Sequence, residues 1–508
     1  MAAPASLTGP VRLSPLEGLM PRAYVRQIYC FPTSSPSAIS TLSQGLTGLA
    51  RDVPYVLSRV ISDKSRTGSS VAVGTQYYSP EDIFSWHDLS ASINYAPLKA
   101  GHFSPSAFLA PGIVPPDSIS PYPASPAVFL ARASLVKGGL ILCVAVYHAV
   151  VDITGFDVLL KIWASHCRDG TSREIGFNAS WMNRSLLFSS VNPPKPSAHA
   201  PMPKLLHIRT PEELARLASR SQAGNVAGSG LKSYRTGIFY FPLQQLRVLK
   251  DAVNALVISQ EPESWVSTSD ILSSLLWGAI IEAEGNYSLL DTNENEADAD
   301  NDIRTSTLSF PVQFRSALRP LLPRDFLGAA FLMTNAKVPH RDVCRISPIR
   351  TNSERGARDQ EVEKVGNPVD IPILAKVALA IRKSVQRIDD AAVREVLKYL
   401  EAHTDINAEA PLILGPPRYD ARGSGASVVS WADQHVYELN WGDAIGSCDT
   451  VRLPKMSYQR DPIVLPRVPS LNGDDGGLEV IMSYEESTLQ KLIEGPIMRR
   501  FAKLRCLS

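Results

Sequence analysis

The stretch GGLILCVAVYHAVVDITGFDVLLKIWA, residues 138–164, joins an apolar run, a histidine, an aspartate and a helical pattern in direct succession. Residues 140–146 are all apolar, which is typical of a strand buried on both faces. From Phe156 onward, apolar residues recur at helical spacing and predict a helix over 156–166. His148 therefore follows a buried strand at the turn into a helix, where a side chain faces a crevice rather than bulk water.

Spacing alone leaves several interpretations of His148 and Asp152 open. A histidine at the end of a buried strand is well placed to act as a general base. A histidine satisfied within the core would show the same pattern, and so would a His/Asp metal pair whose other ligands are missing. The cysteines do not suggest such ligands, because they are scattered and form no C-x-x-C pair: Cys30, Cys143, Cys167, Cys344, Cys448 and Cys506.

Five segments, in order along the chain, resemble blocks of the BAHD-type acyltransferases. His148, Asp152 and Gly155 are similar to that family's HxxxDG signature, in the looser H-x-x-x-D-x-x-G form of fungal members. Residues 430–454, SWADQHVYELNWGDAIGSCDTVRLP, resemble its S-W…D-F-G-x-G block. The other three are LSPLEGLMPRAYVRQIYCFP (13–32), which resembles the fungal trichothecene 3-O-acetyltransferase group, VSTSDILSSLLWGAI (266–280) and FRSALRPLLPRDFLGAA (314–330).

The resemblance implies an α/β fold of two similar chloramphenicol-acetyltransferase-like domains, with an active-site tunnel between them. We expect the N-terminal domain at 1–215, ending in a crossover near 190–215, and the C-terminal domain at 216–508. Two charged stretches near 285–306 and 340–368 lack apolar periodicity, which is typical of mobile inserts.

The local patterns agree with an α/β class. Residues 128–136 and 140–148 are β-rich runs joined by Lys-Gly-Gly, which predicts a hairpin. Helical periodicity predicts helices over 241–256, over 270–284 and again from 371 onward.

Acyl transfer from a thioester to an alcohol needs a base, stabilisation of the oxyanion and an exit for the thiolate. By resemblance, His148 is the general base: it would deprotonate the acceptor hydroxyl and return the proton to the CoA sulfur. Neutral imidazole, with a pKa near 6.5, accepts a proton at cytosolic pH. Trp431 could donate its indole N–H to the oxyanion, with Ser430 adjacent on the CoA side. Trp431 as a large core aromatic is the alternative.

The remaining matched residues have supporting roles in the resembled family. Asp152 is expected to form a buried ion pair with Arg315 that holds the loop in shape. Gly155 is expected to permit a tight turn or close packing. Arg452 falls near the CoA-binding region and could meet a CoA phosphate, although a surface salt bridge is an equal alternative.

The second signature departs from the family pattern. Asn440 replaces its aspartate and Trp441 its phenylalanine, whereas Gly442 and Gly446 are retained. Because the family uses this motif structurally, we expect the change to affect local packing rather than the chemistry.

Composition excludes several function classes. With a net charge of +1, nothing favours nucleic acid or an anionic membrane as partner. No glycine-rich phosphate loop and no G-x-S-x-G elbow supports nucleotide, dinucleotide or serine-hydrolase chemistry. The longest uncharged apolar run, 138–151, is too short for a membrane span, and the N-terminus lacks a signal-peptide pattern. We therefore expect a cytosolic protein, with nothing that demands more than a monomer.

The sequence thus predicts a CoA-dependent O-acyltransferase that needs no metal and uses acetyl-CoA or another acyl-CoA as co-substrate. By resemblance, its acceptor is the hydroxyl of a fungal secondary metabolite, a terpenoid or a polyketide. Three alternatives stay open: acylation of an amine, a condensation-type reaction on the same fold, and a non-catalytic ligand-binding relative, suggested by the altered second motif.

Overall fold

A computed structural model describes most of the chain. The described residues are 11–62, 71–74, 77–116, 125–169, 177–188, 202–208, 234–285, 305–347, 369–402, 412–414, 425–454, 461–470 and 475–508. Most of the expected crossover, and the central parts of both expected inserts, lie outside these residues.

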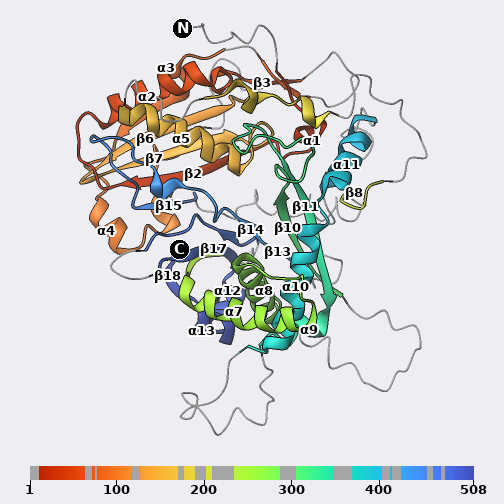
Figure 1. The fold of residues 1–508 in the computed structure, drawn as a ribbon. Coiled ribbons are helices and arrows are strands. Elements are labelled where there is room, and N and C mark those ends of the chain that lie inside the picture. Colours follow the sequence, from red (N-terminus) through yellow and green to blue (C-terminus); the bar gives the residue numbers. More distant parts are fainter. Residues whose placement is uncertain are drawn as a thin grey trace, which may run out of the picture.

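The N-terminal half is built on a five-stranded mixed sheet, in the order β15-β2-β7-β6-β5 (Figure 1). The central strand β7 (Gly139–Tyr147) is buried along its whole length, as the unbroken apolar run at 140–146 predicts. The predicted hairpin is present, because β6 and β7 pair antiparallel around a turn in which Gly138 has a φ of +82°. The strands are β2 (Tyr24–Phe31), β5 (Phe84–Asp88), β6 (Phe129–Val136), β7 (Gly139–Tyr147) and β15 (Thr450–Arg452).

Two helices pack together against this sheet, α2 (Ala38–Asp52) and α5 (Ile153–Asp169) (Figure 1). The predicted helix after His148 is confirmed and is somewhat longer than its sequence pattern indicated. Trp163 of α5 is fully buried, where its ring meets those of Phe129 and Trp441 edge-on. The apolar face of α5 is therefore held against both the sheet and the second signature.

The C-terminal half contains a second five-stranded sheet, β14-β16-β17-β9-β18, and a three-stranded sheet, β11-β10-β13. Helices α7, α8 and α10 gather around these strands together with α12 (Glu486–Glu494) (Figure 1). The predicted helices at 241–256, at 270–284 and from 371 are present as α7 (Leu243–Gln260), α8 (Thr268–Ala283), α10 (Ile371–Gln386) and α11 (Asp390–Ala402). The strands are β9 (Tyr234–Pro242), β10 (Thr305–Gln313), β11 (Phe331–Pro339), β13 (Gly425–Ser427), β14 (Val429–Ser430), β16 (Ile463–Val464), β17 (Gly477–Glu485) and β18 (Lys503–Leu507).

The remaining helices and strands are short. They are β1 (Val11–Arg12), α1 (Pro15–Gly18), β3 (Val60–Ser62), β4 (Val71–Val73), α3 (Pro80–Ile83), α4 (Tyr95–Ala100), β8 (Leu206–Ile208), α9 (His340–Cys344), β12 (Leu412–Leu414), α12 (Glu486–Glu494) and α13 (Pro496–Phe501). Short 3-10 helices occur at Pro54–Leu57, Pro105–Leu109, Ala179–Met182, Ser185–Leu187 and Val436–Glu438.

The packing does not follow the sequence division near residue 215 everywhere. Strand β15 belongs to the C-terminal half but pairs antiparallel with β2 at the edge of the N-terminal sheet. Phe314, Phe326 and Trp441 are likewise buried in the N-terminal core. The α/β class is confirmed, whereas the assignment of 1–215 and 216–508 as separate domains stays a prediction.

The expected mobile insert near 340–368 is wrong over its first residues. His340–Cys344 forms helix α9, in which Val343 and Cys344 are buried in the C-terminal core. Thr305 and Ser306, at the end of the other expected insert, begin strand β10. Charge content misled here, because a charged stretch can still carry a few apolar residues that pack.

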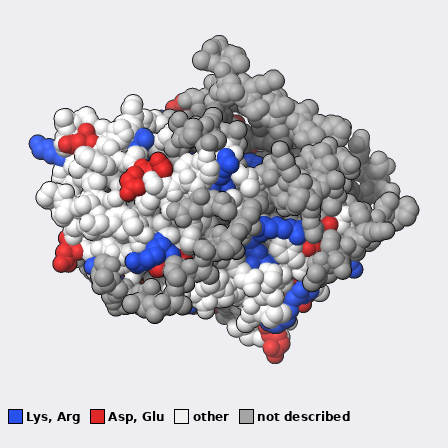
Figure 2. Space-filling view, turned by 90° about the horizontal axis from the view of Figure 1, so that it is seen from above, with Lys and Arg blue, Asp and Glu red and all other residues white. Residues whose placement is uncertain are grey.

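Charges of both signs occur on the face shown in Figure 2, in keeping with the net charge of +1. Across the described residues, we find no helix that combines the length and apolar character needed to cross a membrane.

Candidate active site

His148 lies directly after β7, in the turn that leads into α5. Its backbone N–H donates to the carbonyl of Ala23 (2.9 Å), and the N–H of Val150 donates to the carbonyl of Tyr147 (2.9 Å). Its ring faces that of Phe331 at the start of β11, with 6.0 Å between ring centroids. Because β11 belongs to the C-terminal half, His148 lies where the two halves meet.

The environment keeps His148 neutral. Burial lowers the pKa of His148 below its ordinary value, against smaller opposing contributions from its own carbonyl and from the charge of Asp152. Among the described residues, the buried Nδ1 has no hydrogen-bond partner outside its own residue. A proton on Nδ1 can bond that carbonyl, which leaves the Nε2 lone pair as the acceptor that a general base requires.

The lowered pKa of His148 predicts the pH dependence of the reaction. A base works in its deprotonated form, so the acid limb of kcat/KM should be centred below the ordinary imidazole pKa of about 6.5. CoA release can be followed by chromatography between about pH 5 and 8. An acid limb centred above the ordinary value would identify a different group as the base.

The ion pair predicted between Asp152 and Arg315 is present. Arg315 Nη1 donates to Asp152 Oδ2 (2.8 Å) and Nη2 to Oδ1 (2.7 Å), and each side chain is 4 % exposed. Oδ1 also accepts from the N–H of Gly155 (2.9 Å), and Oδ2 from that of Ala330 (2.9 Å). Burial alone would raise the pKa of Asp152, but Arg315 and these donors outweigh it and hold the pKa below its ordinary value.

Gly155 lies in a confined space in the first turn of α5, as expected. A Cβ at this position would come within 2.7 Å of Val151 Cγ1 and 3.4 Å of the Phe326 carbonyl. A larger residue would therefore collide first with the Val151 side chain in the turn before the helix.

A second buried ion pair lies beside the first, and sequence reasoning missed it. Arg184 Nε donates to both carboxylate oxygens of Glu17, at 3.0 Å each, and the side chains are 3 % and 0 % exposed. The spacing Ser14-x-x-Glu17 is a capping-box signature, and the box is formed at α1. That spacing could have identified Glu17 as structured, but nothing in the sequence pointed to Arg184.

Trp431 and Ser430 lie at the end of β14. The N–H of Trp431 donates to the carbonyl of Val464 (2.8 Å), and its half-buried ring packs against a cluster that includes Ile463. Ser430 is exposed. Among the described residues, the ring beside His148 is that of Phe331 rather than Trp431. Participation of Trp431 and Ser430 in the reaction therefore stays a prediction.

The loop after Trp431 is anchored to the N-terminal half by residues that the sequence did not single out. Gln434 Oε1 accepts from Gln27 Nε2 (2.6 Å) in β2, and Gln27 Oε1 accepts from the Tyr29 hydroxyl. Asp157 of α5 accepts from the N–H of His435 (3.0 Å) and contacts its Nδ1 (3.0 Å). The second signature is thus fixed to the same helix that follows His148.

Asn440 stabilises the turn of the second signature. Its Oδ1 accepts from the N–H of Gly442 (2.9 Å), and a neutral amide oxygen serves this turn as well as a carboxylate. Gly442 has a φ of +86°, and a Cβ there would lie 2.9 Å from the Cys167 carbonyl. Trp441 is fully buried against Phe31 and Trp163.

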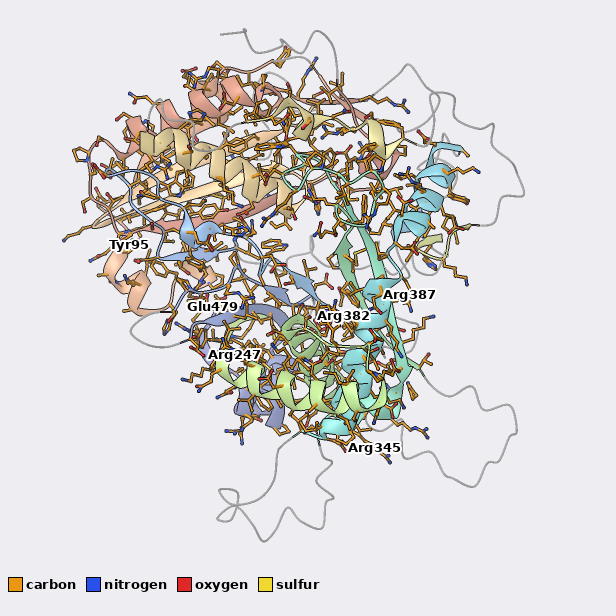
Figure 3. The ribbon with its side chains drawn as sticks, viewed as in Figure 1. Tyr95, Arg247, Arg345, Arg382, Arg387 and Glu479 are labelled. Carbon is orange, nitrogen blue, oxygen red and sulfur yellow. The ribbon has the colours of Figure 1, made fainter. Side chains whose placement is uncertain are left out.

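The expectation that Arg452 meets a CoA phosphate is wrong, and so is the surface salt bridge. Arg452 is buried and pairs with Glu479 of β17, at 2.6 Å and 3.2 Å. Its remaining donors bond the carbonyls of His102, Phe103 and Val451, so no N–H is left for a ligand. Figure 3 shows Glu479 near the middle of the molecule, between the two halves.

The structure thus brings His148, Asp152, Gly155 and Arg315 together, while Arg452 lies apart in the junction of the two sheets. Within the described part of the chain, no group of three or more histidine, cysteine or carboxylate side chains is arranged to hold a metal ion.

Comparisons with known proteins show which family the chain resembles. A model of the trichothecene 3-O-acetyltransferase-like N-terminal domain matches residues 23–167, and a model of the Transferase family matches residues 99–351. The chain is 24 % identical over 515 residues to the O-acetyltransferase ptmV of Penicillium ochrochloron, covering 96 % of each chain. It is 23 % identical over 512 residues to the communesin N16 acyltransferase cnsK of Penicillium expansum, covering 96 % of this chain and 97 % of the relative.

The fold is similar to that of F. graminearum TRI101, solved with coenzyme A and deoxynivalenol. The TM-score is 0.70 at 18 % identity, over 98 % of this chain and 99 % of that one. The signature around His148, the buried pair behind it, the two matching family models and this shared fold all lead to one conclusion: the chain is an acyltransferase of the BAHD-type Transferase family, with a trichothecene 3-O-acetyltransferase-like N-terminal domain.

Proposed function

We propose that this acyltransferase moves an acetyl group from acetyl-CoA to a hydroxyl of a secondary metabolite, with His148 as general base. The observation that carries the proposal is the state of His148: a neutral imidazole at the junction of the halves, on a turn fixed by buried ion pairs. Its Nε2 takes the hydroxyl proton while that oxygen attacks the thioester carbonyl. The proton then passes to the CoA sulfur as the C–S bond breaks.

Three features support acetyl-CoA and an alcohol as the substrates. The relative ptmV is named an O-acetyltransferase, and TRI101 was solved with coenzyme A and deoxynivalenol. The chain spans nearly the whole length of both proteins. We propose a terpenoid or polyketide alcohol as acceptor, bound in a tunnel between the halves. In the tetrahedral intermediate, Trp431 is our candidate donor to the oxyanion.

Acylation of an amine is the second candidate, because the relative cnsK is named for transfer to N16 of communesin. The same base would serve, since attack by a neutral amine gives a tetrahedral intermediate whose nitrogen is positively charged and must lose a proton. The two candidates differ only in the acceptor. A cytosolic location and a monomeric state remain predictions from the sequence.

The test is the acceptor-dependent release of CoA from acetyl-CoA, measured against matched panels of terpenoid and polyketide alcohols and of secondary-metabolite amines. We expect release with at least one alcohol, accompanied by a product heavier by one acetyl group. Release with amines alone would favour the second candidate. If neither panel gives a product while acetyl-CoA still binds, a non-catalytic ligand-binding role would replace both.

A further inference from the structure

The segment Phe326–Ala330 is held by two buried ion pairs in alternation. Arg315 Nη2 donates to the carbonyls of Phe326 (3.0 Å) and Gly328 (3.2 Å), and Asp152 accepts from the N–H of Ala330. The pair Glu17–Arg184 takes the positions in between. Arg184 Nη2 donates to the Leu327 carbonyl (3.1 Å), and Glu17 Oε1 accepts from the N–H of Ala329 (3.2 Å).

The second pair also reaches the turn that carries His148. Arg184 Nη2 donates to the carbonyl of Val150 (3.2 Å), midway between His148 and Asp152. The N–H of Asp152 points to the Gly328 carbonyl (3.5 Å), so the far end of the turn rests on the same segment. The turn that carries His148 is therefore held through the backbone of three of its residues: His148 bonds Ala23, Val150 bonds Arg184 and Asp152 bonds Gly328.

Backbone support matters here because the imidazole is not held by a partner of its own. In the described structure, Nδ1 has no hydrogen-bond partner beyond its own residue, unlike a base oriented by a carboxylate. The position of Nε2 then depends on the turn itself. A displacement of a reacting group by about 1 Å can lower a rate by roughly 100-fold.

We propose that Arg184 and Glu17 are positioning residues for His148, acting through the Val150 carbonyl and the Phe326–Ala330 segment. This inference rests on the proposed role of His148 as base. Each guanidinium nitrogen of Arg184 has its own partner. Nε donates to Glu17, Nη1 to the Met182 carbonyl, and Nη2 to the carbonyls of Val150 and Leu327. A lysine keeps the charge but cannot supply this rigid fork.

Two variants and one control test the proposal. Arg184→Lys keeps a cation beside Glu17 but loses the fork. In case that variant is unstable, the double variant Glu17→Leu/Arg184→Met replaces the pair by apolar side chains, which buried sites often tolerate. The control is Arg382→Lys. Arg382 of α10 also pairs with a buried carboxylate, donating from Nε (2.9 Å) and Nη2 (2.5 Å) to Asp270 Oδ2, but it lies in the other half of the molecule (Figure 3).

Two readouts separate positioning from general stability. The first is steady-state kinetics with acetyl-CoA and the acceptor found above, corrected for the folded fraction. We expect kcat to fall roughly 10- to 100-fold in both Arg184 variants. KM for acetyl-CoA should stay within about twofold, because both side chains of the pair are buried and their N–H groups and oxygens bond the protein itself. The second readout is the rate at which diethyl pyrocarbonate labels His148, relative to exposed His87, followed by peptide mass spectrometry at one pH.

A loosened turn should expose His148 more often, so we expect its relative labelling to rise at least about threefold in both Arg184 variants and to stay unchanged in Arg382→Lys. Wild-type kcat in a folded Arg184→Lys protein would overturn the proposal, whatever the labelling. If the wild-type protein turns over no acceptor at all, the proposed function fails separately. The positioning role is then tested by the rate of His148 labelling relative to that of His87. If this ratio is unchanged in the Arg184 variants, the positioning role is overturned.

Discussion

Replacement of His148 by alanine is expected to lower the rate of acyl transfer by roughly 10²- to 10⁴-fold and to leave the protein folded. The loss follows from the chemistry, because an alcohol is a weak nucleophile until its proton is removed as the new bond forms. The fold should survive because the imidazole makes no hydrogen bond beyond its own residue within the described structure. Its backbone contacts, to Ala23 and through Val150, do not need the side chain.

The measurement is the initial rate of CoA release with the acceptor identified in the panels, alongside circular dichroism of each protein. His87→Ala is the matched control, because His87 is an exposed histidine on edge strand β5 and should leave the rate unchanged. Equal rates in wild type and a folded His148→Ala protein would remove His148 as the base.

Replacement of Arg315 by alanine is expected to lower the free energy of unfolding by about 3–5 kcal/mol, because it leaves the Asp152 carboxylate buried without its cation. The loss also removes the donors to the Phe326 and Gly328 carbonyls. Such a cost is a large fraction of the stability of an ordinary domain, so much of the protein should become insoluble at 37 °C.

The free energy of unfolding can be measured by urea titration at neutral pH. Arg235→Ala is the control, since Arg235 pairs with Glu486 at the surface, with the two side chains 39 % and 59 % exposed. Exposed pairs contribute at most about 1 kcal/mol. A loss of the same small size in Arg315→Ala would mean that Asp152 is not held as a buried charge, and the account of this turn would have to be revised.

The sequence-based predictions that the structure confirms rest on contiguous patterns. The buried strand before His148, the hairpin with Gly138 and helices α5, α7, α8 and α10 each follow from periodicity within one stretch. The resemblance to a known family added what periodicity cannot: that Arg315, 163 residues from Asp152, is its partner. That pairing is present in the structure.

The predictions that were wrong, and the contacts that the sequence did not predict, concern residues whose surroundings come from distant segments. Arg452 matched a family position near CoA. In the structure, β15 pairs with β2 at the edge of the N-terminal sheet, and Arg452 is surrounded there by Glu479 and the carbonyls of His102 and Phe103. Glu17 and Arg184 lie 167 positions apart, and no local pattern links them. Charge content likewise suggested a mobile insert where α9 packs.

By itself, the sequence determined the α/β class, the elements on either side of His148 and the acyltransferase family, because backbone periodicity and short motifs are local properties of the chain. Tertiary structure alone decided which charges are buried together: Glu17 with Arg184 behind the His148 turn, and Arg452 with Glu479 between the sheets. The physical reason is desolvation. A buried charge must meet its partner and its hydrogen bonds wherever the folded chain supplies them, and that place is not encoded in spacing along the sequence.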